Sequence, residues 1–269
     1  MTPDQTSANL LQSSQDHSGI LRLTLNDPDR LNALSEEMLA ALADAFDQAG
    51  DNPHVRVIIL AAAGPVFCAG HDLKQMTAAR QNADRGGAYF TKILTQCSRV
   101  MQKIVTCPKP FIAEVGGVAT AAGCQLVASC DLAVASDAAQ FCTPGVHIGL
   151  FCSTPMVALS RNASSKHAME MLLTGDPISA IEAAQKGIIT QSLEGVDLAK
   201  HVLEKANKIA SKSSKTLKIG KGAYYRQSEM PLEQAYDYAS QVMVENMLEQ
   251  DAKEGIDAFL EKRTPQWEE

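Results

Sequence analysis

The sequence predicts an α/β fold followed by a region that contains helices alone. Apolar, strand-like stretches alternate with amphipathic helical stretches over roughly the first 190 residues. Beyond Val196 the apolar residues recur only at helical spacing. We therefore divide the chain into a loose, polar N-terminal tail at residues 1–17, an α/β core at 18–197 and a helical C-terminal region at 198–269.

A strand and a helix are expected first. Residues 20–25 alternate between apolar and polar side chains, and the turn residues 26–28 end this strand. Ser35 suits the N-cap of the following helix, and two glutamates come next, where the helix dipole favours negative charge. Apolar residues then recur at helical spacing from Met38 until Gly50.

A buried strand at residues 55–60 runs into a glycine-containing turn at 63–70. A long helix from about residue 88 to 106 ends before Pro108, because proline cannot continue a helix. Residues 111–115 form another short apolar strand. The remaining expected elements are strands at 131–135 and 140–142 and helical material at 155–173.

Small residues dominate the stretch from Gly116 to Gln125, which follows an apolar strand just as the turn at 63–70 does. Each turn leads into a predicted helix, and a helix N-terminus presents unpaired amide N–H groups and a partial positive charge. Two such amides on one carbonyl oxygen would stabilise an enolate or a tetrahedral oxyanion. The alternative is that these glycines and alanines only permit tight turns and close packing.

Composition excludes several classes of protein. The formal net charge of −7 argues against a nucleic-acid partner, so an anionic ligand would need local Lys and Arg. No stretch reaches the ~20 apolar residues of a membrane span. The seven cysteines are odd in number and lack metal-ligand spacing, which favours reduced thiols and no metal site.

The N-terminal residues suggest a cytoplasmic location. The first sixteen residues contain Asp4 and Asp16, no Lys or Arg, and no apolar run. Neither a signal peptide nor a transit peptide is therefore evident. The mitochondrial matrix is the alternative for a eukaryotic chain.

Residues Phe67 to Leu73 resemble the first oxyanion motif of the enoyl-CoA hydratase/isomerase (crotonase) family, and Lys109 through Asp131 resembles the second. The resemblance covers about residues 18–267 and is nearest to the family's enoyl-CoA hydratase domain-containing members, especially at Gly149–Pro155. It implies a spiral of ββα units in two roughly perpendicular sheets, with a helical C-terminal region that forms homotrimers, commonly paired into homohexamers. Further matching motifs lie at residues 26–34, 173–187 and 255–263.

The resemblance also implies a site. The backbone amides of His71 and Ala122 would form the oxyanion hole, with Ala122 in place of the usual glycine. CoA would enter as part of an acyl-CoA or enoyl-CoA substrate, so no separate cofactor is expected. Residues implied for the CoA portion are Arg30 for the phosphates, Ala69, Gly70, Asp72, Leu73 and Lys74 along the adenine and pantetheine path, and Phe259 and Lys262 from a neighbouring subunit.

Two positions depart from the family pattern. Hydratases of the family use two glutamates, and Gln125 and Gly145 stand at those positions here. A glutamine can bind water but cannot take its proton, and glycine has no side chain. If the segment around Gly145 is extended, His147 shares its face and could replace the missing group; alternatively, His147 is a packed structural residue.

Three functions fit these observations. The first is a hydratase-like lyase or isomerase of fatty acid metabolism, which the overall resemblance favours and the two departures oppose. The second is decarboxylation of a malonyl-type CoA thioester, which needs an oxyanion hole but no general base to start it. The third is acyl-CoA binding without turnover, because a fold does not imply catalysis. We expect an enzyme.

Overall fold

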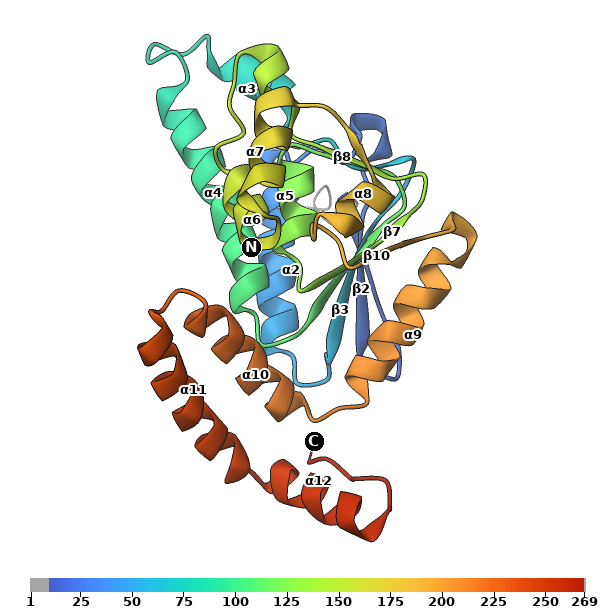
Figure 1. Ribbon diagram of the computed structural model, residues 1–269. Coiled ribbons are helices and arrows are strands. Elements are labelled where there is room, and N and C mark those ends of the chain that lie inside the picture. Colours follow the sequence, from blue (N-terminus) through green and yellow to red (C-terminus); the bar gives the residue numbers. More distant parts are fainter. Residues whose placement is uncertain (1–9, 269) are drawn as a thin grey trace.

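The computed structural model describes residues 10–268 (Figure 1). Its strands are β1 (Leu11–Gln15), β2 (Ile20–Leu25), β3 (Val57–Ala62), β4 (Val66–Cys68), β5 (Phe111–Val115), β6 (Val118–Thr120), β7 (Leu132–Ser136), β8 (Gln140–Cys142), β9 (Ile178–Ser179) and β10 (Gln191–Leu193). Its α-helices are α2 (Glu36–Asp51), α3 (Leu73–Ala79), α4 (Gly87–Thr106), α5 (Ala122–Ser129), α6 (Pro155–Asn162), α7 (Ser165–Thr174), α8 (Ala180–Gln185), α9 (Leu198–Ala210), α10 (Ser214–Gln227), α11 (Leu232–Met247) and α12 (Gln250–Glu261). Short 3₁₀ helices are η1 (Pro28–Arg30), η2 (Pro144–Ile148) and η3 (Gly195–Asp197).

The strands form two sheets. The larger has the order β1-β2-β3-β5-β7-β10, with β1 antiparallel at one edge and the other strands parallel. The smaller has the order β4-β6-β8-β9. From β3 to β8, successive strands alternate between the two sheets, and each of the pairs β3-β4, β5-β6 and β7-β8 is followed by helical segments. This is the ββα spiral core that we expected, with the helices in the places shown in Figure 1.

Apolar side chains are buried on both faces of the larger sheet. On one face, α2, α4 and α5 cover the main core, where the rings of Phe46 and Phe111 meet edge to face at 4.9 Å. On the other face, α9 packs Val202 and neighbouring residues against Val57 and Ile59. Because both faces are covered, the central strands read as continuous apolar runs rather than alternating ones.

The strands predicted at 20–25, 111–115 and 140–142 coincide with β2, β5 and β8. The helical material predicted at 155–173 is two helices: α6 ends at Asn162, and Ser164 caps α7 by accepting a hydrogen bond from the His167 amide. Strands β4 and β6 were not predicted. Each is three residues long and lies among glycines and alanines, which is too short for apolar and polar side chains to alternate recognisably.

The prediction of a loose tail at residues 1–17 is wrong for its second half. Residues Leu11–Gln15 form β1, which pairs with β2 along its whole length, from Leu11 opposite Leu25 to Gln15 opposite Leu21. Backbone hydrogen bonds to the edge of the sheet hold this strand. Its polar composition therefore gave no indication of a strand. Residues 1–9 of the predicted tail lie outside the described residues.

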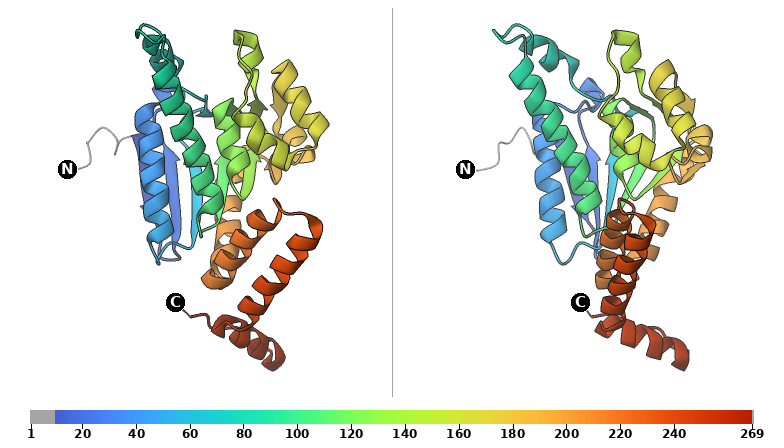
Figure 2. Two further views of the ribbon diagram at one scale, coloured as in Figure 1. Left: turned by 90° about the vertical axis from the view of Figure 1, so that its left-hand side faces the viewer. Right: turned by 60° about the vertical axis from the view of Figure 1, so that its left-hand side comes forward.

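The helices after residue 197 fall into two groups. Helix α9 packs on the larger sheet, whereas α10, α11 and α12 extend beyond the end of the core, as both views in Figure 2 show. A buried ion pair joins α10 to the core: Lys221 Nζ lies 2.7 Å from Asp131 Oδ2. No whole residue of α10 or α11 is fully buried within the chain. No described helix has the length and apolar character needed to cross a membrane.

Candidate active site

The two glycine-containing turns meet at the junction of the smaller sheet and α5. A Cβ atom added to Gly70 would lie 3.2 Å from the Ala122 amide nitrogen and 3.0 Å from Ala121 Cβ. A Cβ atom on Gly123 would lie only 2.1 Å from the Cys68 carbonyl oxygen. Glycine at positions 70 and 123 therefore lets the end of β4 approach the N-terminus of α5 closely.

The amides of His71 and Ala122 are both free to donate. Ala122 is the first residue of α5, so its N–H has no partner inside the helix. Across residues 10–268, neither amide donates a hydrogen bond to a backbone carbonyl or a side chain with good geometry. The residue before Ala122 is strained: Ala121 has φ 52° and ψ −119°, although it has a Cβ atom, and its N–H is held by the Cys142 carbonyl at 2.9 Å.

The segment from Asp27 to Leu34 supports the first turn. The Leu34 amide donates to the Gly70 carbonyl at 2.7 Å, and the Ala69 amide donates to Leu31. Asn32 is fully buried, and its side chain bonds the backbone of Asp27, Ala63 and Val66. This side-chain amide ties its own segment to the turn at residues 63–66, a role that the sequence did not reveal.

Gln125 projects from α5 one turn beyond Ala122, so the two residues share a helix face. Its side chain is 4% exposed, and within the described chain its Oε1 atom has no hydrogen-bond partner. A buried amide oxygen without a partner costs free energy, so a water molecule or ligand group that donates to it would be favoured. Gln125 can thus orient a bound group, but it cannot remove a proton.

The His71 imidazole is buried beside the first turn, and both ring nitrogens lie out of contact with solvent. Burial lowers the pKa of this imidazole, and the nearby Leu34 backbone offsets only part of that effect. Neither ring nitrogen makes a hydrogen bond of good geometry to another described residue. His71 is therefore neutral at neutral pH, with one N–H to donate and one nitrogen to accept.

The prediction that Gly145 and His147 share a face of an extended segment is wrong. Both residues lie in the 3₁₀ helix η2 rather than in an extended segment, and residues two apart do not share a face in such a helix. The His147 side chain is exposed, and its Nε2 atom lies 2.8 Å from the Thr174 carbonyl oxygen. His147 thus ties η2 to the end of α7.

Cys152 occupies the space beside Gly145. Its sulfur lies 2.9 Å from where a Cβ atom on Gly145 would be. Burial raises the pKa of the Cys152 thiol and of the neighbouring Cys124 and Cys142 thiols. All seven cysteines are free. These thiols are protonated at neutral pH and are poor nucleophiles.

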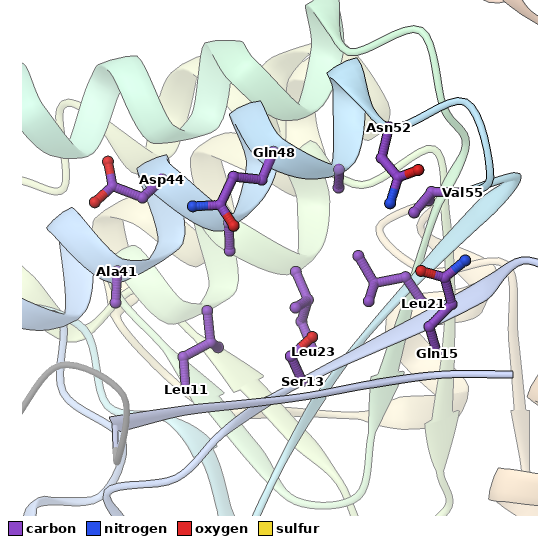
Figure 3. A pocket seen from close by; sticks show the side chains of 12 residues that line it. Leu11, Ser13, Gln15, Leu21, Leu23, Ala41, Asp44, Gln48, Asn52 and Val55 are labelled. Atoms are coloured by element: carbon purple, nitrogen blue, oxygen red, sulfur yellow. The ribbon is translucent and has the colours of Figure 1, made fainter. Parts of the chain in front are cut away.

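A surface groove lies elsewhere. It has a volume of about 400 Å³ and is formed by β1, β2 and α2, with Leu11 and Leu23 at its floor and Asp44 and Gln48 at its rim (Figure 3). None of its lining residues belongs to either turn. It is therefore separate from the candidate site.

The family model for enoyl-CoA hydratase/isomerase matches residues 15–269. The chain belongs to this family. It is 47% identical over 257 residues to the rat enoyl-CoA hydratase domain-containing protein 3, mitochondrial, and this match covers 96% of the chain and 84% of the relative.

Two solved structures of the family have the same fold. An enoyl-CoA hydratase from Mycobacterium smegmatis superposes with a TM-score of 0.91 at 46% identity, over 96% of this chain and 98% of its own. Human enoyl-CoA hydratase domain-containing protein 3 gives the same TM-score at 45% identity, over 96% of this chain and 100% of its own.

The segment at residues 69–74 was predicted from the sequence to line a CoA path. Asp72 is buried and caps α3 by accepting from the amides of Lys74 and Gln75. Leu73 and Lys74 are exposed and accessible. Arg30 lies beside this segment but pairs with Asp27 at 2.7 Å and Asp72 at 3.4 Å, so it is not a free cation.

Phe259 and Lys262 lie on or just after α12, which sits at the opposite end of the molecule from α3 (Figure 1). Phe259 is 82% exposed. One chain therefore does not bring these two residues to its own paired turns. Any contact with a CoA site requires the site of another subunit.

Proposed function

We propose that this protein binds an acyl-CoA thioester and stabilises the enolate form of its carbonyl oxygen with the backbone amides of His71 and Ala122. The observation that carries the proposal is the meeting of two turns whose amides are free to donate. An amide aimed at developing oxyanion charge contributes about 3 kcal/mol to the transition state. The CoA portion would follow residues 69–74, and Arg30 would exchange its pairing with Asp72 for the CoA phosphates.

The likeness to enzymes supports a lyase of the enoyl-CoA hydratase type. Relatives are named enoyl-CoA hydratases, including one from Pongo abelii that is 33% identical over 242 residues. The chemistry here must nevertheless differ from two-carboxylate hydration, because Gln125 is an amide and Gly145 has no side chain. Gln125 would orient a water molecule or the acyl group, and the proton would come from or go to another group or solvent.

Decarboxylation of a malonyl-type CoA thioester is a second candidate, and His71 favours it. In this reaction the bond between the α-carbon and the carboxylate breaks, and its electron pair moves into the enolate held by the two amides. Solvent then supplies a proton to the α-carbon. A neutral, buried His71 has an N–H available to orient the departing carboxylate.

The experiment removes one oxyanion donor at the first position of a helix. Ala122→Pro deletes the amide at the first position of α5, where proline is tolerated. Ser165→Pro makes the same change at the exposed first position of α7 and is the matched control. We would follow loss of the conjugated thioester absorbance of crotonyl-CoA and release of carbon dioxide from malonyl-CoA.

Ala122→Pro should lower turnover about 10²–10³-fold, whereas Ser165→Pro should leave it unchanged. Turnover of crotonyl-CoA supports the first function and carbon dioxide release the second. Butyryl-CoA binding that Ala122→Pro weakens, without turnover of either substrate, would leave acyl-CoA binding as the function. Turnover that Ala122→Pro leaves unchanged would refute the oxyanion hole.

We also propose that the protein assembles as a homotrimer, or as a dimer of trimers. The support is an unpartnered apolar surface on the C-terminal helices, which includes Tyr224, Leu232, Tyr236, Met243, Val244, Met247, Leu248, Phe259 and Leu260. In such an assembly Phe259 and Lys262 would approach a neighbour's CoA. Light scattering should give three or six times the 28.8 kDa chain mass, and the mass of a single chain would refute the assembly.

The names of the rat and human relatives include the word mitochondrial. A cytoplasmic location receives no support from them. We therefore propose the mitochondrial matrix as the location.

A further inference from the structure

The segment 149–152 folds back over Gly145, and the proposed function leaves its role unexplained. Gly149 has φ 75° and ends η2, after which the Leu150 amide donates to the Gly145 carbonyl at 2.9 Å. This tight turn brings the Leu150 carbonyl and the Cys152 thiol against the Cα atom of Gly145.

No side chain fits at position 145 in this arrangement. A Cβ atom there would lie 2.8 Å from the Leu150 oxygen and 2.9 Å from the Cys152 sulfur, closer than real Cβ contacts. One of these two atoms belongs to the backbone and cannot rotate away. Even an alanine at position 145 would therefore require the segment 149–152 to shift.

The surroundings are neutral as well as crowded. Cys152 is 8% exposed, and it lies near enough to Cys142 and Cys124 for the three thiols to influence one another electrostatically. Burial raises the pKa of each of these thiols, so all three are protonated at neutral pH. Gln125 follows Cys124 on α5, and the oxygen of its side-chain amide has no partner among the described residues.

We propose that the Leu150 carbonyl and the Cys152 thiol determine the reaction specificity of this site. They fill the space that a side chain at position 145 needs. They thereby restrict the site to thioesters that reach an enolate without a proton-transferring group there, such as thioesters that carry a carboxylate leaving group on the α-carbon. This inference rests on the proposed function, because it assumes that the thioester lies at the paired turns.

The test restores both carboxylates, with and without the Cys152 sulfur that crowds the second. The double variant Gln125→Glu/Gly145→Glu is compared with a triple variant that adds Cys152→Ala. The control triple variant adds Cys107→Ala instead, at a cysteine that is also 8% exposed but lies at the end of α4. Crotonyl-CoA hydration is measured for all three, and butyryl-CoA, which cannot be hydrated, measures binding by calorimetry.

The triple variant with Cys152→Ala should hydrate crotonyl-CoA about 100-fold faster than the double variant, in line with the usual contribution of general acid–base catalysis. The control triple variant should match the double variant. Equal rates in the double variant and the Cys152→Ala triple variant would overturn the role assigned to the Cys152 thiol.

A second measurement needs no substrate. Gly145→Ala should melt at a lower temperature than the wild type, and Gly145→Ala/Cys152→Ala should recover part of the loss. An unchanged melting temperature in Gly145→Ala would overturn the steric assignment. Failure of the wild type to bind butyryl-CoA would instead refute the proposed function, so the two failures can be told apart.

Discussion

Replacing Lys221 with methionine should lower the free energy of unfolding by about 3–5 kcal/mol, the usual cost of breaking a buried ion pair. The Lys221 side chain is only 8% exposed and that of Asp131 18%. The ammonium group donates to Asp131 Oδ2 at 2.7 Å and to two backbone carbonyl oxygens, each at 2.9 Å. Methionine keeps the apolar stem but removes all three donors, and Asp131 is left buried without its countercharge.

Asp131 keeps two other partners, which limits the loss. Its carboxylate also accepts from the Phe111 amide at 2.7 Å and from the Tyr225 hydroxyl at 2.9 Å. Hydrogen bonds to charged groups contribute about 1.5–3 kcal/mol each. Lys221→Met removes the three bonds of the ammonium group, so their loss should determine the change in the free energy of unfolding. Because Lys221 is on α10, removal of its bonds should also weaken the attachment of α10 to the core.

Urea denaturation at one fixed protein concentration checks this prediction. Lys218→Met on the same helix is the control, since Lys218 is exposed and should change stability by less than about 0.5 kcal/mol. In a double-mutant cycle, Lys221→Met/Asp131→Leu should cost less than the sum of its single changes, because no unpaired charge stays buried. A loss below about 1 kcal/mol in Lys221→Met would refute the reasoning.

Three further predictions follow from the same structure. Ala121→Gly should raise the free energy of unfolding by about 1 kcal/mol, since glycine adopts φ 52° without strain; an unchanged melting temperature would contradict this. Burial lowers the pKa of His71, so the folded state resists protonation and the wild type should lose stability as pH falls below the unfolded value of about 6.5; His71→Gln should flatten this loss, and identical pH profiles would count against it. Arg263 holds the pKa of Glu254 at about 2, so the ion pair between them should persist above the ordinary carboxyl pKa and be lost as pH falls towards 2. Glu254→Gln should free the C-terminal residues after α12 already at neutral pH, and the fluorescence of Trp267, the single tryptophan, would report this. Unchanged emission would refute this role of the ion pair.

The fold was predictable where one pattern ran long enough. Local sequence patterns predict β3 and α2. Strand β3 is a continuous apolar run, and α2 is an amphipathic stretch that Ser35 caps. Short strands among glycines carry no such pattern, and β1 is polar because four of its five residues are exposed. The short strands follow from partners that are remote in the sequence, as β4 at residues 66–68 pairs with β6 at 118–120.

The candidate site was predictable in part for a similar reason. The motifs around His71 and Ala122 indicated two turns, since a backbone amide needs only small neighbours and a helix start. The roles of Asn32 and Cys152 were not evident, because each depends on contacts with a separate segment of the chain. His147 was misjudged because its face depends on whether the chain is extended or helical there.

The sequence by itself determined the family, the α/β architecture and the loss of both expected carboxylates, because these are properties of residue types and their spacing. Only the tertiary structure decided that the two turns meet, that Arg30 is already paired and that Cys152 fills the space at Gly145. The physical reason is that free amides, ion pairs and steric room depend on distances between segments that are far apart in the chain. Such distances are set by the packing of the sheets and helices as a whole.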